Sequence, residues 1–379
     1  MRIDSFYQGK KVLITGHTGF KGTWMCAVLS KLGAVVTGYA LEPPTLPNLF
    51  DLTGMEGRIQ SVLGDIRDID HLKRVFDQVR PEIVIHMAAQ PIVRESYRNP
   101  VYTYDVNVMG TVNVLECVRL CGSVKSFLNV TTDKVYKNRE WEWGYRENEE
   151  LNGFDPYSNS KSCSELVTES YRNSFFADGR TAVSTVRAGN VIGGGDFAAD
   201  RILPDCVRAI EKNREIVLRN PYSVRPYQYV LEPIGAYLLL AQEQYQNCGI
   251  SGSYNIGPEE SSCVRTQELV GTFCQIWQDM TGQSVRWRSE AENGVEEIHI
   301  PETGIRRAEG REMELHKAGF HEANFLKLDI SKIRAVIGWK PRWDYRQMLQ
   351  KTAEWTAGYL QEKDVLEIMN RQIEEYFAE

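Results

Sequence analysis

Short runs of β-branched and other apolar residues alternate with longer amphipathic stretches through the first half of the chain. Such runs, bounded by turn residues, are typical of buried strands. The expected strands are residues 11–15, 34–39, 58–64, 82–86, 126–131 and 181–187. Apolar residues at helical spacing predict helices at residues 20–32, 69–79, 101–120 and 156–175. Because strands that alternate with helices form parallel sheets, we expect an α/β fold, a Rossmann-type doubly wound parallel sheet.

The regular alternation ends near residue 188, and three consecutive glycines at 193–195 open a loop. Residues 1–188 are therefore predicted to form the Rossmann domain, and residues 189–379 a smaller mixed α/β lobe, with residues 230–252 packing on the first domain. The elements expected in the lobe are helices at 203–212, 233–245 and 266–281, and short strands at 216–219 and 254–256. Residues 283–320 have no clean period and predict an irregular segment, followed by two terminal amphipathic helices.

The charge and cysteine content exclude several classes of protein. Forty-four Lys and Arg against 51 Asp and Glu give a net charge of −7, which disfavours nucleic acid and anionic membranes. The eight cysteines are scattered without a C-x-x-C pair, and no apolar run approaches the roughly 18 residues of a membrane span. His299, His316 and His321 lack a supporting cluster of metal ligands. We expect a cytoplasmic protein without a metal.

Residues 16–22 (Gly-His-Thr-Gly-Phe-Lys-Gly) follow the first expected strand and open the first expected helix. In that context glycines let the backbone approach a pyrophosphate, and the helix N-terminus supplies N–H donors. A plain strand-to-helix turn can also contain three glycines, so the surrounding strand and helix give the motif its meaning. The sequence therefore predicts that the first domain binds a dinucleotide, NAD or NADP.

The choice between the two cofactors usually depends on the end of the second strand, where an acid binds ribose hydroxyls or a cation binds a 2′-phosphate. Residues 33–56 contain no Lys or Arg, and Glu42 is their first acid, which favours NAD. His17 and Lys21 place two cation candidates in the glycine loop itself, and they keep NADP open. Asp65 is a candidate for the adenine edge, or else it caps the following turn.

A second motif begins at Asp155, which can cap a helix whose first residue is Pro156. Tyr157 and Lys161 are four residues apart and so share one face of that helix. A free phenol has a pKa of about 10, but an adjacent ammonium and a cationic nicotinamide both stabilise phenolate. Tyr157 could then take a proton from a sugar hydroxyl while hydride leaves the same carbon. An ordinary surface pair is the alternative, and the preceding glycine loop and strands disfavour it.

These motifs resemble those of the extended short-chain dehydrogenases/reductases that act on nucleotide sugars, and within them the CDP-glucose 4,6-dehydratases. The resemblance covers nearly the whole chain except residues 283–320. The matching segments are the glycine loop with His17 and Lys21 and residues 86–91, 129–136, 138–141, 187–196, 219–233 and 325–329. It implies a role in deoxysugar or O-antigen biosynthesis, and a homodimer paired through residues 101–120 and 156–175.

Thr132, Asp133 and Lys134 follow the fifth expected strand, where the carboxyl end of the strand meets the ligand crevice. Loss of water across C5 and C6 of a hexose needs a base for the C5 proton and an acid for the C6 hydroxyl. The resemblance implies that Lys134 is this base, that Asp133 is this acid, and that Thr132 binds the 4-hydroxyl beside Tyr157. The family more often has Ser at position 132 and Cys at position 135. A polar turn with a surface ion pair is the alternative.

A nucleotide sugar carries two phosphates, so an acidic protein must gather local cations around it. Arg201 and Arg225 are expected to bind the pyrophosphate, Asn190 to hydrogen-bond the ligand, and Gln90 and Arg94 to face the sugar. We expect the cofactor to contact Gly16, His17, Gly19, Phe20, Lys21, Gly22, Asp65, Ile66, Ala88, Ala89, Gln90, Asn107, Thr131, Tyr157 and Lys161.

The leading hypothesis is an NAD-dependent hydro-lyase that makes CDP-4-keto-6-deoxyglucose from CDP-glucose. It would oxidise C4, eliminate water and return the hydride to C6, so the cofactor would be recycled. Three hypotheses compete with it. A 4-epimerase or reductase would need Tyr157 and Lys161 but neither Asp133 nor Lys134. A 4,6-dehydratase could act on a different nucleotide sugar, and a dinucleotide sensor would bind the cofactor without catalysis.

Overall fold

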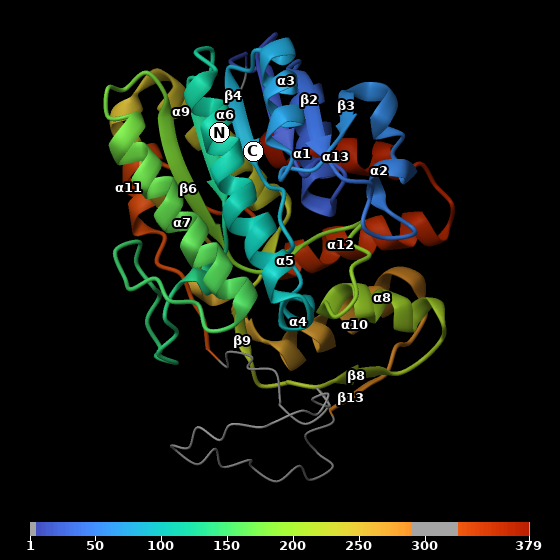
Figure 1. The fold of residues 1–379 in the computed structure, drawn as a ribbon. Coiled ribbons are helices and arrows are strands. Elements are labelled where there is room, and N and C mark those ends of the chain that lie inside the picture. The colour runs from blue at the N-terminus through green and yellow to red at the C-terminus, as the bar shows by residue number, and fades with distance from the viewer. Residues whose placement is uncertain (1–4, 290–324, 379) are drawn as a thin grey trace, which may run out of the picture.

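The computed structural model describes residues 5–289 and 325–378, and its centre is one parallel sheet (Figure 1). Seven strands pair in the order β11-β6-β5-β4-β1-β2-β3. Their bounds are β1 (Lys11–Thr15), β2 (Val35–Ala40), β3 (Gln60–Leu63), β4 (Ile83–His86), β5 (Ser126–Val130), β6 (Ala182–Ala188) and β11 (Ser253–Ile256). The strand order reverses between β1 and β4, where the crevice of a doubly wound fold lies. The predicted α/β fold is confirmed.

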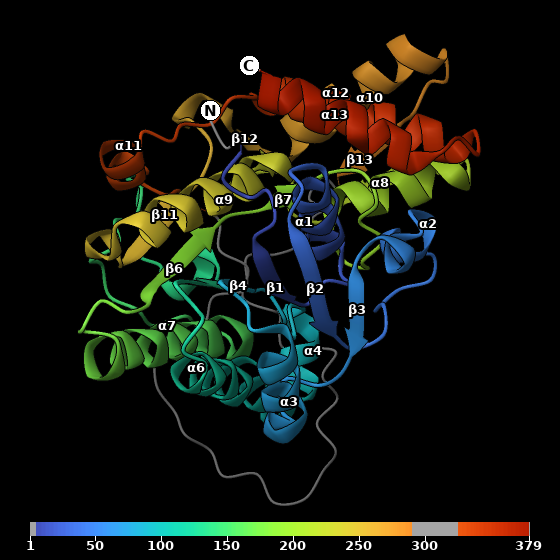
Figure 2. The ribbon, with the colours of Figure 1, turned by 90° about the horizontal axis from the view of Figure 1, so that it is seen from above.

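Two layers of helices cover the two faces of this sheet (Figure 2). One layer contains α3 (Ile69–Val79), α6 (Gly110–Leu120) and α7 (Pro156–Phe175). The other contains α1 (Phe20–Lys31), α9 (Leu231–Gln246) and α13 (Val365–Ala378). Side chains alternate along a strand. Leu13 of β1 therefore packs in the core under α3 and α6, while its neighbours Val12 and Ile14 pack in the core under α1, α9 and α13.

The strand predicted at residues 254–256 is not part of the second lobe. It is β11, the edge strand of the main sheet, and it pairs in parallel with β6. Helix α9 carries the chain back across the sheet before β11, and Gln244 on this helix donates to Ser126 Oγ of β5 at 2.8 Å. Chain order alone suggested the lobe, because pairing between segments so distant in sequence leaves no local pattern.

The helix predicted at residues 101–120 is interrupted. It consists of α5 (Pro100–Tyr104), a π-helical turn (Asp105–Met109) and α6. The wider turn contains the buried Asn107, whose side chain accepts from the Gln90 backbone N–H at 2.8 Å and donates to Ser160 Oγ at 2.9 Å. Asn107 therefore fixes the loop after β4 to α7, as π-turns near functional sites often do.

The second lobe lies over the carboxyl ends of the strands. Its helices are α8 (Ile202–Glu211), α10 (Thr266–Thr281) and α12 (Tyr345–Leu360), and the short helices elsewhere are α2 (Leu49–Leu52), α4 (Val93–Arg98) and α11 (Ser331–Ile337). Its short paired strands are β7 (Val191–Ile192) with β10 (Gln228–Tyr229), β9 (Val224–Pro226) with β12 (Cys263–Arg265), and β8 (Ile216–Leu218) with β13 (Trp287–Ser289). Most of the predicted irregular segment 283–320 lies outside the described residues. Among the described residues, no helix is long and apolar enough to cross a membrane.

Candidate active site

A cavity of about 1080 Å³ lies between the carboxyl ends of the central strands and the second lobe. It is lined by the glycine loop, the ends of β4 and β5, the first turns of α7, and residues of the lobe between positions 189 and 225. Every site residue predicted from the sequence lines it except His17 and Asn107. Segments far apart in the chain therefore meet at one place, although the role of each side chain stays a prediction.

The glycine loop forms a cradle that fits a dinucleotide. A Cβ atom on Gly16, whose φ is +80°, would lie 2.8 Å from the backbone nitrogen of Ala88, and one on Gly22 would lie 2.1 Å from the Gly16 carbonyl oxygen. Helix α1 starts after Gly19 without a side-chain cap. Its first N–H groups are thus available to a pyrophosphate at the cavity wall.

His17, one of the two cation candidates in the glycine loop, is a neutral ring in the structure. Its ring is fully buried against Gly38 of β2, and its Nε2 lies 2.8 Å from Ser61 Oγ. Burial lowers the pKa of His17 to about 4, so the ring is neutral at neutral pH. Lys21 does line the cavity, with its Nζ 3.4 Å from Tyr237 Oη. Burial, followed by the nearby cations of Lys161 and Arg201, lowers the pKa of Lys21 to about 7.

Asp65 lies at the cavity wall after β3, beside Ile66. Its carboxylate accepts from the Arg67 backbone N–H at 2.9 Å and from the Arg67 side chain, whose hydrogen bonds are the main cause that lowers the pKa of Asp65. Asp65 therefore caps the turn that follows β3, which was the alternative role considered for it. Contact with an adenine stays a prediction for the same carboxylate.

The helix that carries Tyr157 and Lys161 begins as predicted. The Asp155 side chain accepts from the Ser158 backbone N–H at 2.9 Å, and Pro156 is the first helical residue of α7. The buried Lys161 Nζ donates to the Val130 carbonyl at 3.2 Å. Burial lowers the pKa of Lys161 to about 8. The ammonium thus links the end of β5 to the helix.

The pKa of the Tyr157 phenol depends on neighbours other than the Lys161 ammonium that the sequence suggested. Burial raises its pKa to about 12, while a hydrogen bond with Thr132 and the charge of Arg201 act in the opposite direction. Without ligands the phenol is therefore protonated at neutral pH. The groups that favour phenolate here come from the triplet and the second lobe.

The triplet of Thr132, Asp133 and Lys134 begins a short 3₁₀ turn after β5, and its carboxyl group is nearly inaccessible. Asp133 is 2% exposed, and its Oδ1 accepts from Thr132 Oγ1 at 3.0 Å. Its Oδ2 has no hydrogen-bond partner among the residues that the structure describes. Burial raises the pKa of Asp133, while the charges of Lys134 and Arg225 partly oppose this rise. A raised pKa is the direction that a general acid requires.

The arginines on the substrate side differ in their partners. Arg201 pairs with Asp196 at 2.9 Å, and Arg94 pairs with Asp200 at 2.9 Å. Arg225 is 5% exposed, and within the described chain its Nη1 has no hydrogen-bond partner. A buried guanidinium nitrogen without a partner is costly, so Arg225 is the arginine best suited to an anionic ligand.

Gln90 and Asn190 also line the cavity. The Gln90 amide is already engaged, because it donates to Thr103 Oγ1 at 2.9 Å and accepts from the Ile92 backbone N–H at 2.6 Å. It is therefore placed to shape the wall, and a sugar contact would compete with these bonds. Among the described residues no cluster of three or more His, Cys, Asp or Glu side chains is arranged for a metal ion. His299, His316 and His321 lie outside that part of the chain.

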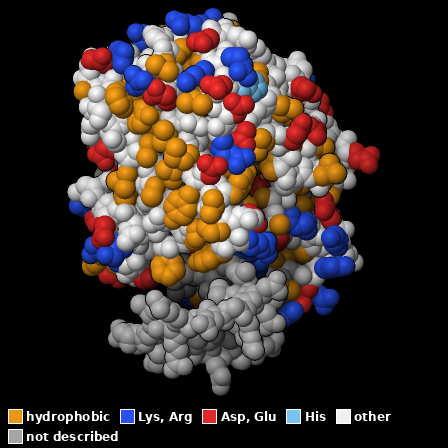
Figure 3. Space-filling view, viewed as in Figure 1, with side chains coloured by type: hydrophobic (Ala, Val, Ile, Leu, Met, Phe, Trp, Pro, Cys, Tyr) orange, Lys and Arg blue, Asp and Glu red, His pale blue; other side chains and the backbone are white. Residues whose placement is uncertain are grey.

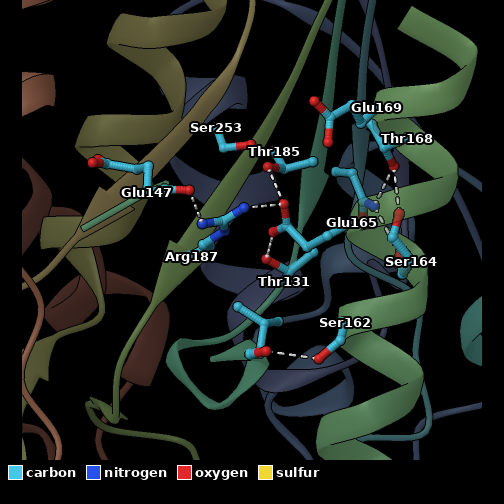
Figure 4. Close-up of polar contacts among 12 residues, drawn as sticks. Thr131, Glu147, Ser162, Ser164, Glu165, Thr168, Glu169, Thr185, Arg187 and Ser253 are labelled. Atoms are coloured by element: carbon cyan, nitrogen blue, oxygen red, sulfur yellow. Dashed lines mark hydrogen bonds and ion pairs between the residues drawn. The ribbon is translucent and has the colours of Figure 1, made fainter. Parts of the chain in front are cut away.

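Two charged residues behind the cavity were not predicted from the sequence. Glu165 of α7 and Arg187 of β6 form a buried ion pair with a 2.9 Å separation (Figure 4). Glu165 follows Lys161 by four residues, so the helical spacing placed it on the same face of α7. Nothing in the local sequence showed that Arg187 would be its partner.

Comparisons with known proteins give a family and several similar sequences. The family model described as GDP-mannose 4,6 dehydratase matches residues 13–352. The CDP-glucose 4,6-dehydratase of Salmonella typhimurium is 43% identical over 99% of this chain and 98% of its own length. The CDP-paratose 2-epimerase of Salmonella typhi is 25% identical over 92% of this chain and 99% of its own.

Solved structures share the fold at lower identity. The dTDP-glucose 4,6-dehydratase of Bacillus anthracis in complex with NAD superposes with a TM-score of 0.71 at 18% identity, covering 94% of this chain and 100% of that one. The UDP-glucose 4-epimerase of Thermotoga maritima with UDP-glucose gives a TM-score of 0.71 at 20% identity, covering 92% and 99%. At such identities the likeness concerns the fold alone.

Proposed function

The chain belongs to the GDP-mannose 4,6 dehydratase family, and from this premise we propose that it is an NAD-dependent 4,6-dehydratase of CDP-glucose. The observation that carries the proposal is the placement of Asp133 and Lys134 in the same cavity as Tyr157 and the glycine cradle. An epimerase or reductase needs no acid and base for elimination. The 43% identity with a CDP-glucose 4,6-dehydratase along the full chain supports the same activity and the nucleotide.

The residues present fit NAD as the cofactor. Gly16 and Gly22 leave no room for a side chain where the loop packs on the Ala88 backbone and on itself, and the uncapped start of α1 offers N–H donors to a pyrophosphate. No Lys or Arg occurs in residues 33–56 to bind a 2′-phosphate, and His17 is neutral. Bound NAD supplies reversible hydride acceptance.

The side chains divide the proton transfers among them. Bound NAD would add the positive charge of its nicotinamide to that of Arg201 and so favour the phenolate of Tyr157. In this form Tyr157, hydrogen-bonded to Thr132, takes the proton of the 4-hydroxyl as hydride leaves C4. Lys134 takes the C5 proton, and Asp133 gives its proton to the C6 hydroxyl, which departs as water. Hydride then returns to C6 and a proton to C5, so the product is the 4-keto-6-deoxy sugar. Burial raises the pKa of Asp133, which is the direction that a proton donor for this step requires.

The substrate is tested by incubating the protein with CDP-, dTDP-, GDP- and UDP-glucose and following the alkali-induced absorbance of a 4-keto product. We expect conversion of CDP-glucose without added reductant. Preference for another of the four would keep the reaction and overturn the nucleotide. No conversion of any of them would overturn the proposed function.

The proposal includes a homodimer. Apolar side chains are exposed along α5, α6 and α7, on the face that Figure 3 presents. They are Val101 (82% exposed), Met109 (51%), Leu120 (55%), Leu166 (52%) and Phe175 (42%). A contiguous exposed apolar surface is typical of an interaction site. Exclusion chromatography with light scattering should give twice the mass of one chain. Leu166→Glu should lower this measured mass, whereas the control Leu360→Glu, on α12, should leave it unchanged.

The proposed location is the cytoplasm. All eight cysteines carry free thiols in the structure, including the exposed Cys248. Free thiols suit a reducing compartment. Labelling of Cys248 in cell extracts prepared with a trapping reagent should find it reduced.

A further inference from the structure

The segment that carries the triplet is attached to α7 on both sides. Before the triplet, Lys161 Nζ donates to the Val130 carbonyl at 3.2 Å. After it, Ser162 Oγ donates to the Val135 carbonyl at 2.7 Å. Asp133 and Lys134 thus take their place from the helix that also carries Tyr157.

One turn further along α7, the Glu165 carboxylate makes a second set of bonds to the same segment (Figure 4). It is 2% exposed and accepts from Thr131 Oγ1, the residue directly before the triplet. It also accepts from Thr185 Oγ1 of β6 at 2.6 Å and pairs with Arg187 at 2.9 Å. Arg187 therefore has its charge compensated inside the protein.

Arg187 extends the network to the other end of the triplet. Its Nη1 donates to Tyr136 Oη at 2.8 Å and to the Glu147 carbonyl at 2.9 Å. Its guanidinium carbon lies 5.0 Å from the centre of the Tyr136 ring. Tyr136 Oη donates in turn to Asn255 Oδ1 of β11 at 2.6 Å. The ion pair therefore bonds the residues that precede and follow the short turn.

We propose that Glu165 and Arg187 are positioning residues for the elimination step, because through Thr131 and Tyr136 they fix where Asp133 and Lys134 stand relative to Tyr157. The inference rests on the proposed function. Neither charged side chain lines the cavity, so both act through the residues that they bind. A displacement of about 1 Å in a catalytic group can cost about 10²-fold in rate. Tyr157 has its own anchor in the Asp155 cap, so oxidation at C4 depends less on the pair.

Tyr136→Phe tests the inference with the smallest change, since it removes one hydroxyl and keeps the ring. Glu165→Gln removes the charge at the centre of the network. Thr185→Val is the matched control. It removes the hydrogen bond that Thr185 of β6 donates to the Glu165 carboxylate, and it leaves the bonds of Thr131 with Glu165 and of Tyr136 with Arg187. Melting temperature and NAD affinity are measured for all three.

In a single turnover with CDP-glucose, we expect Tyr136→Phe and Glu165→Gln to slow dehydration about 10- to 100-fold. The near-ultraviolet absorbance of reduced nicotinamide should rise during this delay, because oxidation proceeds and elimination lags. Thr185→Val should lower the melting temperature and keep the wild-type time course.

Variants that lose stability yet keep the wild-type time course, without reduced nicotinamide, would overturn the inference and make the pair purely structural. If Glu165→Gln does not fold, Tyr136→Phe decides alone. A wild-type protein that converts none of the four nucleotide glucoses would overturn the proposed function, and this inference with it. Conversion by the wild type with unaltered variants would overturn the inference alone.

Discussion

Asp133 and Lys134 illustrate how two adjacent side chains can divide the proton transfers of one reaction. Lys134→Met should leave oxidation at C4 intact while stopping removal of the C5 proton, and Asp133→Asn should leave the C6 hydroxyl without its proton donor. Loss of either group should cost about 10²–10⁴-fold, or about 3 to 5 kcal/mol of barrier. The measurement is single-turnover absorbance of reduced nicotinamide, which should accumulate in both variants. Normal dehydration by both variants would show that Asp133 and Lys134 only form a polar turn and take no part in elimination.

Tyr157→Phe removes the hydroxyl that is expected to take the substrate proton. We expect turnover to fall by about 10²–10⁴-fold, while NAD affinity and melting temperature change little, because only one oxygen is lost. Tyr104→Phe is the control, since Tyr104 lies outside the cavity lining and bonds to Asn159 Oδ1 at 3.0 Å. Activity of Tyr157→Phe within about tenfold of wild type would rule it out as the base.

Arg225 is expected to bind the anionic part of the substrate. Arg225→Met should raise KM about 10- to 100-fold, because a hydrogen bond to a charged group contributes about 1.5 to 3 kcal/mol. NAD affinity should stay near its wild-type value, as measured by calorimetry. Arg265→Met, an exposed neighbour on β12, should change neither quantity. An unchanged KM in Arg225→Met would mean that a different cationic side chain binds the anionic part of the substrate.

At this scale the sequence predicted which residues meet in the cavity better than it predicted their charge states. Residue types and spacing were enough for Tyr157 and Lys161. His17 was one of two cation candidates, yet its burial against Gly38 makes it neutral. Such shifts depend on packing between strands, which no local pattern contains.

Among the elements, the turn from β1 to α1 leaves no space for an added side chain at Gly22. In Gly22→Ala, the added methyl would meet the Gly16 carbonyl oxygen at 2.1 Å, so the loop must move. Overpacking of this kind costs about 1 to 3 kcal/mol, and we expect NAD affinity to fall by at least about tenfold. Gly57→Ala is the control, because its Cβ would have no atom within 4 Å. Calorimetric titration with NAD that gave equal affinities would refute the cradle.

The bounds of α7 and α10 matched the prediction because caps and apolar period are local signals. The π-helical turn at Asp105–Met109 and the position of β11 were missed. Both depend on contacts with distant parts of the chain: Asn107 with Ser160, and β11 with β6. The sequence therefore predicted the elements more reliably than their pairing.

For the molecule as a whole, a buried carboxyl on α9 joins α13 to the segment directly before α12. Glu232 of α9 is 0% exposed and accepts from the Trp343 backbone N–H at 2.8 Å and from Tyr376 Oη at 2.9 Å. Burial raises the pKa of Glu232 from 4.5 to about 7. Between these values the folded protein retains a proton that the unfolded chain releases. Its stabilising contribution is thus complete below about pH 4.5 and is lost as the pH rises through about 7.

The melting temperature of the wild type should therefore fall relative to that of Glu232→Gln as the pH rises from about 5 to about 8. Calorimetry of both proteins across this range measures the difference. Glu367→Gln, which changes an exposed carboxylate on α13, should keep a constant offset from the wild type. A constant offset for Glu232→Gln as well would show that this carboxyl does not titrate in the range.

The return of the chain to the main sheet has a consequence for synthesis on the ribosome. Trp24 Nε1 of α1 donates to the Gly194 carbonyl, Tyr7 Oη to the Leu238 carbonyl, and Lys31 pairs with Glu374. Strand β6 gains its outer neighbour only when β11 has been made. Tyr7, Trp24 and Lys31 thus receive these partners from segments that are synthesised much later. The nascent Rossmann half must therefore persist with an open sheet edge at β6 until residues 253–256 have been made.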